Sequence, residues 1–148
     1  MTLLRLFIYT SILFSGCSEL PVVKFGSVHG LDVIPTTQIH YQLGGRFGYQ
    51  LNFPRDVGAI KIREEFFLPG PSHWVIDPST DKTLTRRVVI RQSRDGSFRI
   101  REFELTRHGA GDWFRASYEL APGDPQGAYK IRLWLNARLP KEFNFRVE

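Results

Sequence analysis

The sequence predicts a single all-β domain built as an antiparallel sandwich of about seven to nine strands. Apolar residues recur with a period of two along most of the chain, and Gly-, Pro- and Asp-rich turns interrupt this pattern at short intervals. No window after the first 20 residues keeps the spacing of an amphipathic helix. Residues 22–148 are long enough for one domain with a sizeable core.

The chain opens with the three parts of a secretory signal. Arg5 gives a short basic region, residues 6–14 are apolar, and Ser15-Gly16 supplies the small residues that a signal peptidase requires. The apolar run is shorter than the roughly 20 residues that a membrane-spanning helix needs. We therefore expect residues 1–16 to be a signal peptide.

Cys17 is the only cysteine in the chain. Together with the residues before it, it resembles the lipobox of bacterial lipoproteins, in which the chain is cut before a cysteine that then carries a diacylglycerol. The resemblance implies a lipid on Cys17, a short tether over residues 17–21, and anchoring to the membrane through the lipid. Ser18 follows the cysteine in place of Asp, which implies the periplasmic face of the outer membrane. The alternatives are an ordinary signal peptide with a chance cysteine nearby, or a buried first strand.

Residues 21–28 are the first expected strand of the domain. Pro21 and Gly26 within it favour a position at the edge of a sheet, because both residues are unfavourable inside a sheet. Residues 29–42 are predicted to be an irregular connector, or to hold a short strand at 37–41.

Residues 46–53 and 59–67 both alternate, and we predict that they pair as a hairpin through a turn at 54–58. The expected inward residues are Phe47, Tyr49, Leu51 and Phe53 in the first strand and Ile60, Ile62 and Phe66 in the second. The glycines at 44, 45 and 48 indicate a tight turn with close backbone packing. They do not indicate a phosphate loop, because a strand follows them where such a loop needs a helix.

Strands are also expected over 83–92 and 97–105, with Val88 and Ile90 inward in the first of them. The turn between them contains the pair Asp95-Gly96, a strong hairpin signal. The apolar phase changes inside 97–105, which predicts a β-bulge near Arg101 and Glu102. Further strands are predicted at 112–120, 128–136 and 142–147, the last two forming a final hairpin.

The corner before the final hairpin has a recognisable form. Leu120-Ala-Pro122-Gly123 leads into a strand that opens with Tyr129. In immunoglobulin-like sandwiches such a tyrosine can fold back and hydrogen-bond the backbone of the corner. Tyr129, Pro122 and Gly123 are therefore candidate structural residues, and the alternative for Tyr129 is a plain inward side chain.

More of the chain, about residues 22–148, resembles a bacterial family of exported Ig-like single-domain proteins, a domain of unknown function. The resemblance rests on Ile34-Pro35, Gly45-Arg46-Phe47-Gly48, Asp77-Pro78, Tyr118-Glu119-Leu120-Ala-Pro122-Gly123 and Phe143-x-Phe145-x-Val147. It implies an Ig-like sandwich and brings no activity with it.

The Pro-rich loop at 68–82 and the strand after it hold the candidate binding residues. His73 and Trp74 lie in the loop, and Trp is a frequent anchor at interfaces. Arg86 and Arg87 open an arginine-rich stretch that favours an acidic partner such as anionic lipid or lipopolysaccharide. The alternatives are a tryptophan that caps the end of the sandwich, and a solvated sheet face. On such a face the arginines would pair with Glu64, Glu65, Glu102 and Glu104.

The sequence carries no recognisable catalytic or metal-binding spacing. None of the four histidines belongs to an HxH or HExxH motif, and no nucleophile is evidently placed beside His73 and Asp77. We expect no cofactor, no metal and, after export, no nucleic-acid partner.

The sequence therefore predicts a non-enzymatic binding or assembly module of the cell envelope, with an envelope protein or an anionic polymer as partner. One alternative is a carbohydrate-binding module that uses Trp74, Trp113 or Trp134 as a stacking platform for a sugar ring. The other is a hydrolase of an envelope polymer that uses His73, Asp77 or the acidic pairs.

Overall fold

The structure is a computed structural model that describes residues 21–148 except 43, 57, 73–87, 106–109 and 139. Its described residues form ten strands: β1 (Val22–His29), β2 (Asp32–Pro35), β3 (Gln38–Ile39), β4 (Arg46–Asn52), β5 (Ile60–Phe67), β6 (Val89–Gln92), β7 (Phe98–Leu105), β8 (Trp113–Glu119), β9 (Gly127–Leu135) and β10 (Lys141–Val147). None of the described residues belongs to a helix that could span a bilayer.

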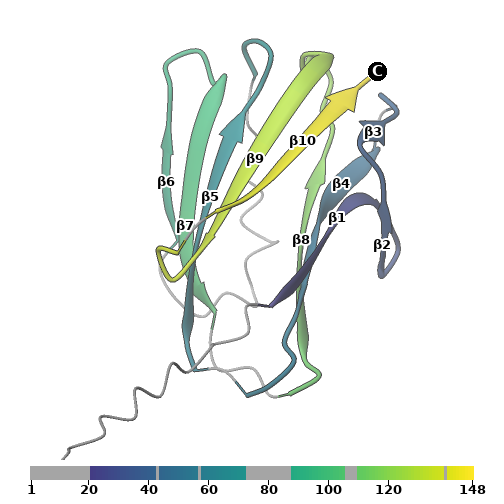
Figure 1. Ribbon diagram of the computed structural model, residues 1–148. Coiled ribbons are helices and arrows are strands. Elements are labelled where there is room, and N and C mark those ends of the chain that lie inside the picture. The colour runs from purple at the N-terminus through teal and green to yellow at the C-terminus, as the bar shows by residue number, and fades with distance from the viewer. Residues whose placement is uncertain (1–20, 43, 57, 73–87, 106–109, 139) are drawn as a thin grey trace, which may run out of the picture.

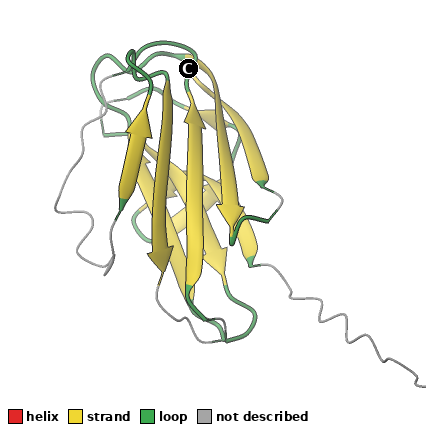
Figure 2. Cartoon of the chain, turned by 90° about the vertical axis from the view of Figure 1, so that its left-hand side faces the viewer, coloured by secondary structure: helices red, strands yellow, loops and turns green. Residues whose placement is uncertain are grey.

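The strands form two sheets that pack face to face as two layers (Figures 1 and 2). The four-stranded sheet has the order β2-β1-β4-β8, and the six-stranded sheet has the order β3-β10-β9-β5-β7-β6. The predicted all-β sandwich is confirmed. It has more strands than expected because the connector at 29–42 contains β2 and β3, and β3 pairs with the last strand in parallel.

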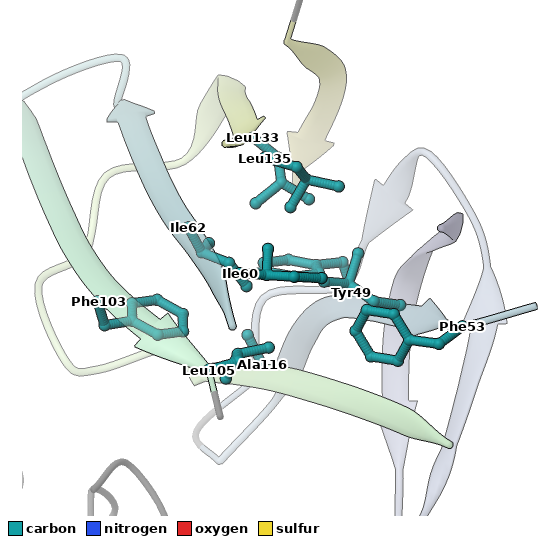
Figure 3. Packing of buried hydrophobic residues seen from close by; sticks show 10 residues of the cluster. Tyr49, Phe53, Ile60, Ile62, Phe103, Leu105, Ala116, Leu133 and Leu135 are labelled. Carbon is teal, nitrogen blue, oxygen red and sulfur yellow. The ribbon is translucent and has the colours of Figure 1, made fainter. Parts of the chain in front are cut away.

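The inward residues of the two sheets form the core, as the period of two predicted. One cluster, part of which is drawn in Figure 3, contains Tyr49, Leu51, Phe53, Ile60, Ile62, Phe103, Leu105, Ala116, Leu133 and Leu135. A second cluster contains Ile39, Phe47, Phe66, Leu120, Tyr129, Ile131, Phe145 and Val147. These residues come from both sheets, so burial of their side chains holds the layers together.

The predicted hairpin between the strands near 46–53 and 59–67 is wrong. β4 pairs with β1 and β8 in one sheet, whereas β5 pairs with β7 and β9 in the other. Phe53 still pairs with the approach to β8: its N–H donates to Asp112 O at 3.0 Å and its carbonyl accepts from Gly111 N at 2.8 Å. The chain then crosses to the second layer. The apolar faces of β4 and β5 meet across the core, and alternation alone does not distinguish this arrangement from a hairpin.

The predicted edge position of the first strand is confirmed only for its first half. Among the described strands, residues 22–25 pair with β4 alone, whereas Gly26–His29 lies between β2 and β4. Gly26 has a different role. A Cβ atom on this residue would lie 1.9 Å from the carbonyl oxygen of Ile34 in β2. The glycine therefore allows a close approach of two backbones, which is the other common reason for glycine within a strand.

The predicted bulge near Arg101 and Glu102 is absent from the pairing of β5 with β7, which runs without interruption from Ile60↔Leu105 to Phe67↔Phe98. The odd-numbered residues of β7 all face the core, from Arg99 and Arg101 to Phe103 and Leu105. The apparent phase change thus arises because two inward positions hold arginine.

Two predicted hairpins are confirmed, β6 with β7 and β9 with β10. In the first, Asp95 Oδ1 accepts hydrogen bonds from Ser93 Oγ at 2.7 Å and from the N–H and hydroxyl of Ser97 at 3.1 and 2.8 Å. These hydrogen bonds lower the pKa of the Asp95 carboxyl to about 2, and the bond from Ser93 has the largest effect. The first of the two strands is described from Val89, so residues 83–87 of its predicted range lie outside the described residues.

Registers define the two ends of the sandwich. Val22, Asn52 and Trp113 form one row across β1, β4 and β8, at the end where the chain enters β1. We call this the N-proximal end. Arg46 and Glu119 pair at the opposite, distal end, toward which β10 carries the C-terminus (Figure 1).

Candidate functional site

None of the four candidate binding residues, nor the candidate for lipidation, belongs to the described part of the chain. Cys17, His73, Trp74, Arg86 and Arg87 all lie outside the described residues. The described part of the loop before His73 ends at Ser72, which is buried. The Ser72 hydroxyl donates to Asp124 Oδ1 at 2.7 Å and its N–H donates to Asp95 O at 3.1 Å. These two bonds hold Ser72 at the distal end of the sandwich.

Tyr129, Pro122 and Gly123 are described and form one corner at the distal end. The Tyr129 hydroxyl donates to the carbonyl oxygen of Pro125 at 2.6 Å, four residues upstream, while its ring lies in the core. Burial raises the pKa of Tyr129. Gly123 has a φ of 90°, a left-handed conformation that favours glycine, and Pro122 lies exposed beside it. This geometry is that of a tyrosine corner.

A cluster of four polar side chains lies between the sheets. Glu64 of β5 is completely buried, and its carboxylate faces Arg101 of the neighbouring strand β7. Arg101 Nε donates to Glu64 Oε2 at 2.6 Å, and Nη2 donates to Oε1 at 3.1 Å. Two tyrosines of the opposite sheet complete the cluster: the hydroxyls of Tyr49 and Tyr118 both donate to Glu64 Oε1, that of Tyr118 at 2.6 Å.

Burial determines how these groups titrate. Loss of hydration raises the pKa of Tyr49 and of Tyr118 well above the usual value, and the charge of Glu64 raises both further. Burial opposes the charge of Arg101, but the carboxylate of Glu64 more than compensates, so the pKa of Arg101 is raised. The two tyrosines thus stay protonated donors to the carboxylate, and the cluster hydrogen-bonds one sheet to the other.

The expectation that Glu64 is a surface partner is therefore wrong, whereas Glu65 and Glu102 do pair on the outer face of the six-stranded sheet. Arg63 contacts Glu65 at 2.7 Å and Glu102 at 3.4 Å, and Arg91 contacts Glu102 at 3.0 Å. Glu64 shares the inward alternation of Ile60, Ile62 and Phe66, so its position in that series was the available signal.

An open groove lies along one side of the sandwich, between β1 and β10. Its volume is about 540 Å³, and it is lined by Phe25, Pro35, Thr36, Thr37, Glu142, Phe143 and Asn144. The rings of Phe25 and Phe143 stack across it with centroids 5.0 Å apart. Glu142 is the only carboxylate in the lining. Its hydrogen bond from Arg132, 2.8 Å long, lowers the pKa of this carboxyl.

Beside this groove the first part of β10 is an open sheet edge. β3 pairs with β10 only at Arg146 and Val147, and no other described strand lies on that side. Arg146 N–H donates to Thr37 O at 2.8 Å, so this residue turns its backbone groups away from β9. Backbone groups alternate sides along a strand, and Glu142 and Asn144 therefore turn theirs toward the groove as well.

The sequence gives no signal for this groove, because its lining comes from three separate segments of the chain. As for metals, the part of the chain that the structure describes holds no group of three or more His, Cys, Asp or Glu side chains placed to bind an ion.

Comparison with known proteins identifies the fold and its family. The model of a family described as the PM0630 beta sandwich domain matches residues 20–148. Among solved structures, the chain is similar to an immunoglobulin-like protein from Pseudomonas aeruginosa, with 17% sequence identity and a TM-score of 0.53. The match covers 86% of this chain and 92% of that one. No curated protein matches the chain. The expected Ig-like β-sandwich is thus confirmed as a fold.

Proposed function

The chain belongs to the PM0630 beta sandwich domain family, and we propose that it is a lipid-anchored, non-enzymatic binding or assembly module of the bacterial cell envelope. The observation that carries the proposal is the open edge of β10 beside the groove. An extended segment of an envelope protein would bind there as an added strand.

The groove supplies both components that strand addition needs. The N–H and C=O groups of Glu142 and Asn144 are oriented for main-chain hydrogen bonds to an incoming strand. The stacked rings of Phe25 and Phe143 offer an apolar surface for the alternate side chains of that strand. β3 already pairs with the last two residues of β10, so the incoming segment would continue the same sheet along the remainder of the edge.

The anchor is supported by the sequence and by the direction of the chain. Cys17 ends a signal-like segment, and Pro21, four residues later, precedes a strand that starts at the N-proximal end. A lipid on Cys17 would hold this end at the periplasmic face of the outer membrane. The groove, at the side of the sandwich, would stay accessible to other envelope proteins.

Two experiments test the proposal. For the anchor, Cys17→Ser should move the protein from the membrane fraction to the soluble fraction. If Cys17→Ser leaves the fractionation unchanged, the anchor is refuted.

For binding, a photo-crosslinking residue at Thr36, inside the groove, should give a discrete adduct with an envelope protein in cells. Asn144→Pro, which removes an edge N–H, should abolish the adduct. Asn144→Ala, which keeps that N–H, should retain it. An adduct that survives Asn144→Pro, or no adduct at all, would overturn strand addition.

A further inference from the structure

The outer face of the four-stranded sheet carries an unusual set of side chains at the N-proximal end. Two neighbouring rows cross β1, β4 and β8 there, and their side chains point away from the core. The first row is Val22, Asn52 and Trp113, and the second is Lys24, Gln50 and Arg115. We call these six residues the N-proximal array.

The array combines two exposed apolar side chains with two cationic side chains. Val22 is 57% exposed and Trp113 is 48% exposed, whereas their neighbours in sequence, Val23 and Phe114, pack on the core. The Arg115 guanidinium lies 5.8 Å from the centre of the Trp113 ring, and its Nη1 donates to Gly30 O at 2.8 Å. The hydrogen bond to Gly30 thus holds the Arg115 guanidinium beside the Trp113 ring.

The charge of the array is one-sided. Lys24 and Arg115 are its charged members, and the centre is filled by two amides, with Gln50 Nε2 donating to Asn52 Oδ1 at 2.7 Å. A carboxylate of this face, Glu119, lies at the distal end, where Arg46 contacts it at 3.1 Å. The six residues of the array thus present two positive charges beside an indole and a valine.

The position of the array relative to the anchor identifies its partner. Three residues, 18–20, separate Cys17 from Pro21, and Val22 of the array follows directly. Four Cα steps of at most about 3.6 Å place the lipid-bearing residue within about 14 Å of Pro21. In a protein held by that lipid, the array stays within reach of the headgroups. A surface nearer the distal end would lie too far from them.

We propose that the N-proximal array is a second membrane contact, which lies against an anionic phospholipid surface. Trp113 would lie at the headgroup level, the position that tryptophan prefers in membranes. Lys24 and Arg115 would face lipid phosphates, and Val22 would enter the boundary of the acyl region. The contact would fix the orientation of the sandwich, with the outer face of the six-stranded sheet turned away from the lipid. This inference rests on the proposed lipid anchor.

The test uses the full lipidated protein reconstituted into vesicles that contain phosphatidylglycerol and a lipid brominated in its acyl chains. Bromine quenches only tryptophans that reach the bilayer. We expect Trp113→Phe to remove most of the quenchable fluorescence. Trp134→Phe, on the outer face of the six-stranded sheet, is the matched control and should leave the quenched fraction intact.

The charge requirement is tested in the same vesicles. Lys24→Glu should weaken the contact between the array and the membrane at least about fivefold, because it removes one basic charge. Quenching should fall accordingly. Lys24→Arg should preserve quenching. Arg94→Glu, an equal change of charge at the exposed turn between β6 and β7, should have no effect. Vesicles of phosphatidylcholine alone should give less quenching than the anionic ones.

Failure of the array and failure of the anchor are distinguishable. Mass spectrometry of the mature protein reports the lipid on Cys17, and an unlipidated chain would refute the anchor. If the protein is lipidated and vesicle-bound but Trp113→Phe leaves the quenching unchanged, the array is refuted while the anchor remains. Equal quenching in Lys24→Glu and the parent protein would refute the electrostatic part of the contact.

Discussion

The buried cluster gives the sharpest test of how the two sheets are held together. Arg101→Met removes two of the four hydrogen bonds to Glu64 and the cation that pairs with its carboxylate. Glu64 is completely buried, so water does not replace them without opening the core. Breaking a buried pair in this way costs about 3–5 kcal/mol. For a domain of this size that corresponds to a fall in Tm of roughly 6–20 °C.

The assay is urea denaturation at pH 7, with thermal unfolding as a second measurement. Arg46→Met is the matched control, because Arg46 pairs with Glu119 at 3.1 Å and both side chains are more than half exposed, and ion pairs at the surface contribute about 1 kcal/mol or less. The double variant Arg101→Met with Glu64→Leu should be more stable than Arg101→Met alone, because no buried carboxylate is left without its cation.

Two results would refute this reasoning. One is a loss in Arg101→Met that is no larger than the loss in Arg46→Met. The other is a double variant that gains nothing over the single one. Either would mean that the carboxylate gains no net stabilisation from the guanidinium in the folded protein.

Three further predictions use the same unfolding assays. Gly48→Ala should lower the free energy of unfolding by about 1–3 kcal/mol or more, because the new Cβ would lie 2.0 Å from Ala116 O. Gly58→Ala, with open space around the new Cβ, should be nearly neutral. Similar losses in the two variants would contradict the close approach of β4 and β8. Tyr129→Phe should cost about 1 kcal/mol through the lost bond to Pro125, and an unchanged urea midpoint would show that the corner bond contributes nothing. The raised pKa of Tyr49 means that the unfolded chain loses the phenol proton first, so stability should fall as the pH rises above about 10. Tyr49→Phe should reduce that slope, measured as the urea midpoint against pH, and an identical slope would contradict a protonated buried phenol.

The sequence predicted the core of this protein well because the information is local. Phe47, Tyr49 and Leu51 alternate with polar neighbours, and all three are buried as expected. The turn at Asp95-Gly96 needs only its own residues to form, and it joins β6 to β7 as predicted. Where polar residues occupy inward positions, local pattern misleads. An arginine at the inward position 101 gives the same pattern as a bulge. The local pattern does not reveal that Glu64 is buried, because its partners lie 15 to 54 residues away.

By itself, the sequence determined the strand class, the apolar inward positions and the tight turns, since each depends on neighbours along the chain. Only the tertiary structure decided which sheet receives each strand and where a sheet edge remains open. β4 and β5 look like a hairpin in sequence and face each other across the core in space. The polar cluster, the groove beside β10 and the N-proximal array each combine residues from separate strands. Hydrogen-bond ladders between distant segments bring them together, and alternation along one strand does not specify its partner.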